Sequence, residues 1–396
     1  MKIGFVGNTN NYPFLLARAM HRLGHPIEFI VHRPEPLHRP ESSYGEMPAG
    51  FNVVDLATIN PSDVAKNSSR VRKAREVLNS CDAVIANELG PAICSELDRP
   101  FAALITGSDL TQAANPESIP SIVGHEQRFP RPLRRVYLKS ILSRTVERQR
   151  EGIRRAVCVG TYLAPGILKS ADRIFADIGV DDRKRFYFVM IDTDALEYAP
   201  SPAARSTVRI LCVTRHVWKQ PFPAGLSDAD DKRSDIMLRG LALFLKQTGL
   251  KLDIRLVKKG NHVTDSIELS KELGIDAHIT WLNEMTQKQV RDEMRQADVV
   301  LEQFGQTGFG MSSLEAMCLG RPVILNCRPD VLNAQLGNTP ACHAEQPEQI
   351  AAHLEDLVAS RERRESTGRA CRAFVLEHLS TGKAAEKFLS RLSPGA

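Results

Sequence analysis

The sequence lacks long apolar runs and paired cysteines. No stretch approaches the roughly 20 consecutive apolar residues that a membrane-spanning helix needs. The N-terminus stays apolar for only a few residues before Asn8, too short for the core of a signal peptide. The eight cysteines include no Cys-x-x-Cys pair and do not cluster with His at metal-ligand spacing. We therefore expect a cytoplasmic protein with free thiols, no disulfide framework and no metal site.

The excess of positive over negative charge is small. The 396 residues include 52 Lys and Arg against 47 Asp and Glu, and 42% of the residues are apolar. This composition is ordinary for a soluble globular protein of two or three domains, and it excludes disorder and a coiled coil. The net charge of +5 has its source in residues 128–155, where ten Arg and Lys face two Glu.

Short apolar runs alternate with longer amphipathic stretches, a pattern typical of βα units around parallel sheets. A stretch rich in Pro, Ala and Ser at residues 198–206 interrupts the pattern as linkers do, and the pattern then restarts. The sequence predicts an α/β protein with two βα domains, residues 1–197 and 207–378. Strands are expected at residues 3–6, 27–31, 83–86, 102–105, 157–159, 186–189, 209–213, 254–257, 279–281, 299–301 and 322–325. Ligands of such sheets bind beyond the carboxyl ends of strands, so the loops after strands are the places to search.

The most informative loop joins an expected strand to a helix late in the chain. It contains Gly308, Phe309 and Gly310, and glycines let a ligand approach the backbone closely. The free N–H groups at the start of the following helix, near Met311, are a good seat for phosphate. Glu315 lies one turn into that helix, where its carboxylate can accept hydrogen bonds from a pair of vicinal hydroxyls.

These residues carry a resemblance to a known family. Gly308-Phe-Gly310, Glu315-Ala-Met317 and Gly320-Arg-Pro-Val323 resemble the nucleotide-sugar motif of the GT-B glycosyltransferases of family 4. The resemblance implies two Rossmann-like domains that face each other across a cleft. It also implies that the last segment, residues 379–396, crosses back to the first domain as a helix.

The resemblance assigns roles along this loop. Glu315 would grip the nucleotide ribose, and Gly308, Phe309, Gly310 and Met311 would bind the donor. Thr307 stands where the family usually has a glutamate that contacts hydroxyls of the donor sugar.

A second loop, after the expected strand 209–213, supplies cations. The family places an Arg just after this strand and a Lys just before the next helix, and together they neutralise the pyrophosphate of the donor. Arg215 matches the Arg and Lys232 matches the Lys, although the spacing to Lys232 is longer than usual. Lys219 is a rival candidate for the role of Lys232. Fixed cations of this kind stabilise the charge that builds up as a phosphate departs.

The first domain offers three candidates at strand ends. Gly7 and Asn8 follow the first strand, where the family's glycine loop approaches the donor phosphates. Asp109 follows another strand, near the position at which relatives often carry a His or Asp that meets the transferred sugar. A role as helix cap or Asx-turn is an equally good interpretation of Asp109. Glu88 lies on a similar loop and is expected to be a surface carboxylate rather than an acceptor contact.

The basic segment 128–155 is predicted to form a helix from about Pro132, because its apolar residues have near-helical spacing and its cations lie on the remaining face. Three interpretations stay open: a solvated face, a groove for an acidic acceptor, or a docking surface for an anionic membrane. Nucleic acid is the least favoured partner, because no aromatic stacking platform accompanies the cations.

Taken together, the sequence predicts a retaining glycosyltransferase that moves a sugar from a nucleotide-diphosphate sugar, with a UDP-sugar favoured, to a hydroxyl of a sugar, glycan or lipid-linked acceptor. The resemblance implies no essential divalent metal, and the sequence agrees, because no Asp-x-Asp stands at a strand end. No cofactor is expected. The expected location is the cytoplasm, with peripheral attachment to the inner membrane face left open. Two alternatives remain: a nucleotide-sugar epimerase of the same fold, and a catalytically silent nucleotide-sugar-binding protein.

Overall fold

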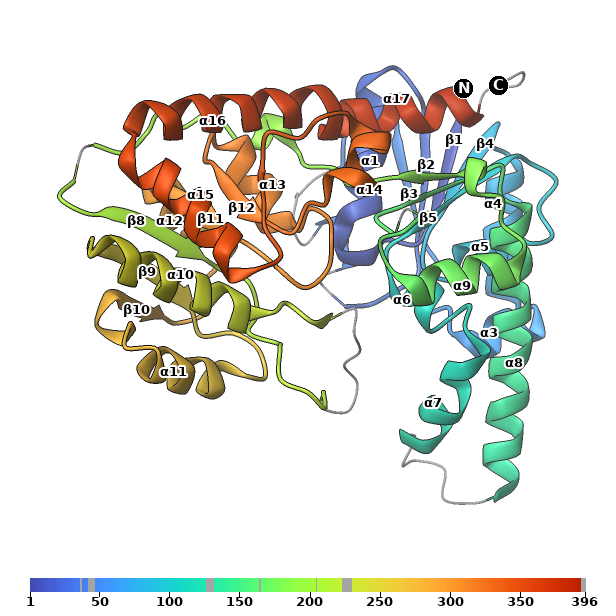
Figure 1. Ribbon diagram of the computed structural model, residues 1–396. Helices are drawn as coiled ribbons and strands as arrows, with labels where there is room; N and C mark the ends of the chain where they lie inside the picture. Colours follow the sequence, from blue (N-terminus) through green and yellow to red (C-terminus); the bar gives the residue numbers. More distant parts are fainter. Residues whose placement is uncertain are drawn as a thin grey trace. The chain divides into compact units, whose positions relative to one another are not determined.

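The computed structural model describes residues 1–35, 38–41, 47–125, 132–163, 165–203, 205–222 and 230–392. The chain forms two compact units, each built around one parallel β-sheet (Figure 1). Unit 1 comprises Met1–Val189 together with Thr381–Ala396, and unit 2 comprises Met190–Ser380. All strand pairs in the described residues run parallel, as the βα pattern predicts.

Unit 1 has a seven-stranded sheet in the order β3-β2-β1-β4-β5-β6-β7. Its strands are β1 (Ile3–Val6), β2 (Ile27–Val31), β3 (Phe51–Asp55), β4 (Ala83–Ala86), β5 (Phe101–Ile105), β6 (Cys158–Thr161) and β7 (Arg185–Tyr187). Its helices are α1 (Tyr12–Arg22), α3 (Pro61–Lys66), α4 (Ser69–Asn79), α5 (Gly90–Cys94), α6 (Ser108–Thr111), α7 (Ile119–His125), α8 (Pro132–Arg155), α9 (Lys169–Ile178) and α17 (Thr381–Leu392).

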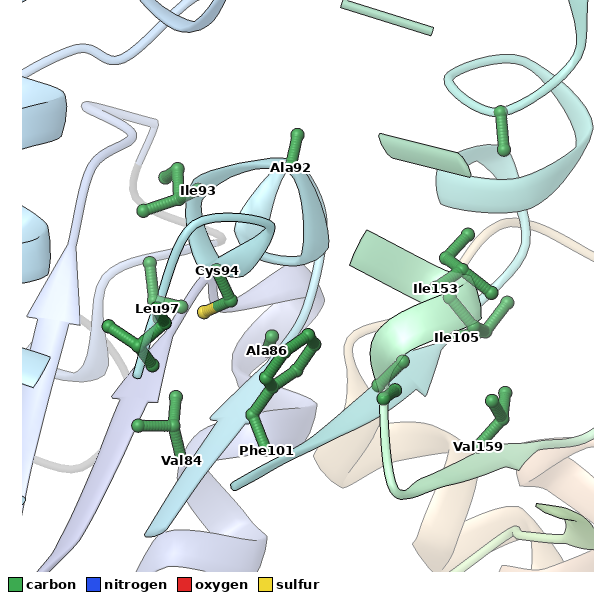
Figure 2. Packing of buried hydrophobic residues seen from close by; sticks show 14 of the residues in the cluster. Val84, Ala86, Ala92, Ile93, Cys94, Leu97, Phe101, Ile105, Ile153 and Val159 are labelled. Carbon is green, nitrogen blue, oxygen red and sulfur yellow. The ribbon is translucent and has the colours of Figure 1, made fainter. Parts of the chain in front are cut away.

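The central strands of this sheet are buried on both faces, which explains why they read as unbroken apolar runs. Figure 2 shows the packing on one face, where side chains of β4 and β5 meet apolar residues of α5 and Ile153 of α8. The final helix, α17, packs on α1 within the same unit. Phe388 of α17 lies 5.1 Å from the ring of Phe186 and 5.0 Å from that of Phe188, and these aromatic contacts anchor the end of the chain.

Unit 2 has a six-stranded sheet in the order β10-β9-β8-β11-β12-β13. Its strands are β8 (Val208–Cys212), β9 (Leu252–Val257), β10 (Ile279–Leu282), β11 (Val299–Leu301), β12 (Val323–Leu325) and β13 (Cys342–His343). Its helices are α10 (Ser234–Thr248), α11 (Val263–Glu272), α12 (Gln287–Gln296), α13 (Met311–Cys318), α14 (Pro329–Leu336), α15 (Pro347–Ala359) and α16 (Arg361–Phe374). Helices α10 and α15 pack together over an apolar core that includes strands β8 and β9.

The division between the units differs from the predicted linker. The chain passes between the units at Val189/Met190 and again at Ser380/Thr381, not within residues 198–206. Part of that stretch is held on unit 2 by Arg321, which is 1% exposed and donates to the carbonyls of Ala199 and Pro200. A Pro-rich composition therefore marks a packed extended segment here; Ala204 lies outside the described residues.

All eight cysteines are free, and seven of them are buried. They behave as small apolar side chains, as expected for free thiols in a core.

Candidate functional site

Unit 2 has its topological switch point between β8 and β11. The strands β9 and β10 extend the sheet on one side of this pair, while β12 and β13 extend it on the other. The loops that follow β8 and β11 must diverge here, and such a point opens a crevice for ligands at the carboxyl ends of the strands. The predicted cation loop follows β8, and the predicted glycine loop follows β11.

The glycine loop leads directly into α13. Gly308 has φ +128°, a backbone conformation that residues with a side chain rarely adopt, and its N–H donates to the carbonyl of Asn326. Thr307 is buried, and its hydroxyl donates to Oδ1 of Asn326 at 2.7 Å. Gly310 is the N-cap of α13, so the first N–H groups of that helix follow it. Thr307 therefore fastens the loop to the end of β12.

The two apolar residues of the loop face different surroundings. The ring of Phe309 is buried and lies 6.1 Å from the ring of Phe374, so it anchors the loop to α16. Met311, the first residue of α13, is 46% exposed. Of these two predicted donor-binding residues, only Met311 offers its side chain to a ligand.

Glu315 lies on the buried face of α13, with 7% of its side chain exposed. Its Oε1 accepts from Arg291 Nε at 3.0 Å, from Arg291 Nη2 at 2.8 Å and from Gln287 Nε2 at 3.1 Å. These donors come from α12 and hold the carboxylate in one orientation. No described residue donates to Oε2, so this oxygen keeps its capacity to accept from a hydroxyl.

Lys232 directly precedes α10, as predicted. Its N–H donates to the carbonyl of Val217, and its carbonyl accepts from the N–H of Phe304, so its backbone ties the loop after β8 to the loop after β11. Its Nζ donates to Oε1 of Gln303 at 2.5 Å. Burial lowers the pKa of Lys232, an effect that the nearby Glu302 opposes. The structure therefore brings Lys232 to the glycine loop.

Arg215 and Lys219 lie on the same loop as Lys232 but are more exposed. Arg215 pairs with Asp230, with 3.2 Å between Nη2 and Oδ1, and its side chain is 42% exposed. Lys219 pairs with Asp265 at the start of α11, and its side chain is 59% exposed. This pairing ties Lys219 to α11, whereas Lys232 reaches the residues after β11.

Glu302 is not among the site residues predicted from the sequence. It follows β11 immediately, and its side chain accepts from Thr214 Oγ1 at 3.2 Å and from Ser312 Oγ at 3.3 Å. Burial raises the pKa of Glu302, and no described residue hydrogen-bonds its Oε2. Its position at a strand end was the signal that could have found it. The comparison with the family's motif pointed away from it, because Glu302 stands five residues before Thr307.

In unit 1, the predicted residues also lie at strand ends, and two of them, Gly7 and Asn8, have structural roles in their loop. Gly7 has φ +89°, and a Cβ there would lie 2.2 Å from the carbonyl oxygen of Asn87, so no side chain fits. The amide of Asn8 is buried and bonds Asn11, the carbonyl of His38 and the N–H of Phe14. Gly7 and Asn8 therefore shape the loop after β1.

Both oxygens of Asp109 are engaged within its own loop. They accept from the N–H groups of Thr106 and Gly107 and from the hydroxyl of Thr106. Burial raises the pKa of Asp109 to about 6, against these hydrogen bonds, which lower it. These N–H groups precede Asp109 in the chain, whereas an Asx-turn or a helix cap uses N–H groups that follow the side chain, and α6 has no side-chain cap. The carboxylate therefore braces the turn that leads into α6, and the catalytic role of Asp109 stays a prediction.

Glu88 is not a surface carboxylate, contrary to expectation. Its side chain is 11% exposed, because the loops after β1, β2 and β4 close around it. Its surroundings are described in full below.

The basic segment divides into two halves along α8. In the C-terminal half, Arg148 pairs with Glu96, Arg154 pairs with Glu151, and Arg155 donates to the carbonyls of Ser95 and Leu97. In the N-terminal half, no carboxylate of a described residue pairs with Arg135 or Lys139. Arg128 and Arg131 lie outside the described residues.

Apolar side chains are exposed beside the N-terminal half of α8. Leu133 is 84% exposed, Val136 is 67% exposed and Tyr137 is 53% exposed, and Ile122 of α7 is also exposed. Between α7 and α8 lies an open groove of about 210 Å³, lined by Ile119, Pro120, Val123, Arg135, Val136 and Lys139. Figure 1 shows these two helices extending away from the sheet of unit 1.

The described residues contain no group of three His, Cys, Asp or Glu side chains that could hold a metal ion. None of their helices combines the length and the apolar character that a membrane span requires.

Comparison with known proteins agrees with this architecture. The family of glycosyl transferases group 1 matches residues 228–374, which include Lys232 and the glycine loop. Among solved structures, Anabaena Alr3699/HepE in complex with UDP and glucose is similar, with a TM-score of 0.61 and 13% identity over 99% of both chains. The fold is that of the GT-B glycosyltransferases.

Two further GT-B structures are similar over nearly their whole length. The lipopolysaccharide outer core galactosyltransferase WaaB has a TM-score of 0.60 at 13% identity, and 99% of each chain is covered. A glycosyltransferase from Rickettsia africae has a TM-score of 0.63 at 13% identity, covering 98% of this chain and 97% of the other. No curated protein matches the chain in sequence. The family match and the shared fold support a group 1 glycosyltransferase.

Proposed function

We propose that the protein is a retaining, metal-independent glycosyltransferase of family 4 that transfers a sugar from a nucleotide-diphosphate sugar to a hydroxyl acceptor. The observation that carries the proposal is the switch point of unit 2. There the loop after β8 brings Lys232 to Gln303 and Phe304, in the loop that leads into α13, and α13 carries Glu315 one turn further on. A nucleoside diphosphate needs this combination of a cation, free N–H groups and a carboxylate that accepts from hydroxyls.

In this proposal each group of the donor has a partner. The diphosphate lies at the N-terminus of α13 and faces Lys232 and Arg215, and the ribose hydroxyls donate to Glu315 Oε2. UDP is the favoured nucleotide, since the similar Anabaena structures are complexes with UDP or UDP-glucose. Thr307 replaces the glutamate that the family resemblance leads one to expect and fastens the loop, so the sugar hydroxyls would meet other groups.

The chemistry follows from the same charges. The bond between the anomeric carbon and the donor phosphate oxygen breaks while the acceptor oxygen bonds to that carbon from the same face. The acceptor proton passes to the departing phosphate oxygen, so no protein nucleophile is required. Lys232, Arg215 and the N-terminus of α13 stabilise the negative charge that the phosphate gains.

Donor hydrolysis tests this proposal against its two alternatives. The protein is incubated with UDP-glucose, UDP-galactose, GDP-mannose and ADP-glucose in EDTA, and the release of nucleoside diphosphate is measured. Slow release from one donor supports the transferase. Interconversion of the sugar while it remains attached to the nucleotide supports the epimerase, and binding without any turnover supports the silent binding protein.

We also propose that unit 1 attaches peripherally to an anionic membrane, so that the protein works at the inner face of the membrane on a lipid-linked acceptor. The supporting observation is the surface formed by α7 and the N-terminal half of α8. Leu133, Val136 and Tyr137 are exposed there beside Arg135 and Lys139. Apolar side chains next to cations suit the boundary between lipid tails and anionic headgroups. The C-terminal half of α8, where Arg148 and Arg154 are paired with Glu96 and Glu151, has no part in this proposal.

A further inference from the structure

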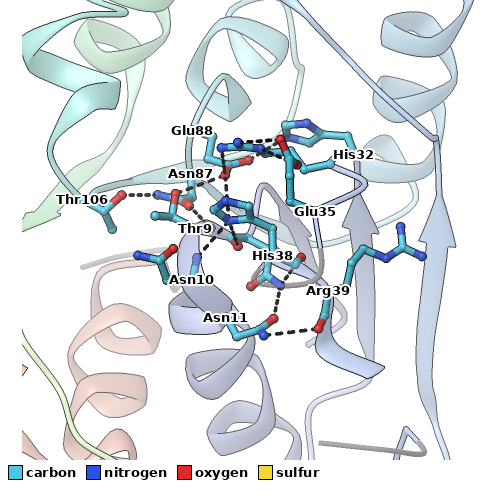
Figure 3. Close-up of polar contacts among 12 residues, drawn as sticks. Thr9, Asn10, Asn11, His32, Glu35, His38, Arg39, Asn87, Glu88 and Thr106 are labelled. Atoms are coloured by element: carbon cyan, nitrogen blue, oxygen red, sulfur yellow. Dashed lines mark hydrogen bonds and ion pairs between the residues drawn. The ribbon is translucent and has the colours of Figure 1, made fainter. Parts of the chain in front are cut away.

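Unit 1 has a switch point of its own, between β1 and β4. The strands β2 and β3 extend the sheet beyond β1, and β5, β6 and β7 extend it beyond β4. The loops after β1, β2 and β4 converge at this point, and Figure 3 shows their polar side chains pointing toward one another. None of these side chains belongs to the donor site of unit 2.

Glu88, directly after β4, is the centre of the cluster. Its Oε1 accepts from Thr9 Oγ1 at 3.2 Å and from Arg33 Nη1 at 3.4 Å. His38 Nδ1 lies 3.8 Å from the same oxygen, and His32 Nε2 lies 3.3 Å from Oε2 (Figure 3). The carboxylate thus collects donors from the loops after β1 and β2.

Two observations indicate that the cluster is built for a ligand. The side chain of His32 is 2% exposed; its Nε2 has only the ion-pair contact with Glu88 at 3.3 Å, and its Nδ1 has no hydrogen-bond partner within the described residues. Buried polar atoms are nearly always satisfied, so the unsatisfied Nδ1 at a strand end needs an explanation. In addition, Glu88 has φ +56°, a backbone conformation that residues other than Gly, Asn and Asp seldom adopt.

The rim of the cluster is open to solvent. The side chain of Arg33 is 40% exposed, and Asn10, on the loop after β1, is exposed as well. A ligand can therefore meet the guanidinium of Arg33 and the carboxylate of Glu88, 3.4 Å apart, and the exposed Asn10 adds an amide to the same group of loops.

The charges select the chemical class of this ligand. A central carboxylate disfavours a phosphate or a carboxylate, because two anions would lie side by side. The guanidinium of Arg33 is already engaged by Glu35, with hydrogen bonds of 3.2 and 3.0 Å, and so does not offer an anion a free cation. A carboxylate only accepts and a guanidinium only donates, whereas a hydroxyl group can satisfy both.

We propose that Glu88, together with His32, Arg33 and Asn10, binds the hydroxyl groups of an uncharged sugar. This inference rests on the proposed function and deepens it, because the uncharged sugar would be the acceptor, or the acceptor's reacting end. The basic segment 128–155 left an acidic acceptor as one interpretation. The present proposal is of a neutral acceptor instead.

The test uses the full-length protein and needs no turnover. Methyl glycosides of glucose, galactose and mannose, together with glucuronate and inorganic phosphate, are titrated by calorimetry or saturation-transfer NMR. We expect at least one neutral glycoside to bind and Glu88→Gln to weaken that binding about tenfold or more, the loss expected for a hydrogen bond to a charged group. The matched control is Glu96→Gln in the same unit, where the half-exposed carboxylate pairs with Arg75 and Arg148.

Folding and donor binding are followed in the same samples. If Glu88→Gln lowers the unfolding temperature, Arg33→Gln is the second variant; its exposed side chain can be changed with little effect on the fold, and it too should weaken glycoside binding. The proposal is overturned if no glycoside binds, if glucuronate, or phosphate with the donor site of unit 2 filled by UDP, binds more tightly, or if the variants bind as the wild type does. UDP affinity reports separately on unit 2, so the sugar site stands if glycosides bind while UDP does not.

Discussion

Glu302 lies directly beneath the N-terminus of α13, where its Oε1 would be 2.5 Å from a Cβ built on Gly310. This glycine has φ −78°, so a side chain is excluded by the buried carboxylate and not by the backbone conformation. The glycine loop and the carboxylate after β11 therefore fit each other closely.

Gly310→Ala is expected to lower the free energy of unfolding by about 1–3 kcal/mol, because the new methyl group must displace a buried charged side chain. It should also weaken UDP binding, since the first turn of α13 would shift. Urea unfolding and calorimetry measure the two effects. The control is Gly124→Ala in α7, where a Cβ meets no atom within 4 Å. Equal changes in the free energy of unfolding and in UDP affinity for the two variants would contradict the close fit.

Lys232 and Lys219 offer a matched pair for testing the cation that faces the leaving phosphate. Lys232→Ala should reduce kcat by about 100- to 1000-fold with a smaller change in KM, as for other fixed groups that stabilise developing charge. Lys219→Ala should change kcat by less than about threefold, because its exposed pair with Asp265 contributes little. Steady-state rates with the preferred donor decide between them. A larger loss for the Lys219 variant would reverse the assignment.

Asp109 predicts a pH effect on stability. Its pKa is raised to about 6 in the folded protein, mainly by burial, from an ordinary value of 3.8. An acid with a raised folded pKa holds its proton more tightly when folded, so the free energy of unfolding falls as pH rises from about 4 to about 6. The loss is about 3 kcal/mol at most.

Asp109→Asn should remove this dependence. The free energies of unfolding of wild type and variant are measured with urea at pH 4.5 and pH 7. Between these two pH values, the free energy of unfolding should fall more for the wild type than for the variant. A difference that stays constant between the two pH values would show that Asp109 ionises normally.

The surface of α7 and α8 predicts binding to anionic vesicles. Binding is measured by sedimentation with phosphatidylserine vesicles. Removal of either charge, at Arg135 or at Lys139, should reduce binding about fivefold, since a cation near such a surface contributes about 1 kcal/mol. Leu133→Ser should reduce it as well. Arg154→Gln is the control, because that cation on the same helix is paired with Glu151. Equal binding to neutral phosphatidylcholine vesicles, or an equal loss in the control, would contradict the docking surface.

Much of the fold could be predicted because central parallel strands are apolar on both faces. Strands β1, β2, β4 and β11 have the predicted bounds. Strand β3 (Phe51–Asp55) and strand β13 (Cys342–His343) were missed because they lie at sheet edges, where polar residues interrupt the apolar run. The packing of residues 198–203 on unit 2 depends on Arg321, a tertiary contact that composition does not reveal.

The candidate site could be predicted where a local motif carries it. Gly310 and Glu315 are spaced by one helical turn, so the sequence alone places them together. Their partners were not predictable in this way, because Arg291 and Gln287 reach Glu315 from another helix. The same holds for Glu88, whose neighbours come from strand ends separated by up to 79 positions along the chain.

The central claim is that unit 2 binds a nucleoside diphosphate through Glu315. Titration of UDP into the wild type and into Glu315→Ala, by calorimetry in EDTA, tests it most directly. Glu293→Ala serves as the control, since that carboxylate pairs with Arg255 on the same unit. We predict UDP binding without metal by the wild type and the control, and affinity about 10- to 100-fold weaker in Glu315→Ala. Equal affinity of all three proteins, or no binding of UDP by the wild type, would contradict the account.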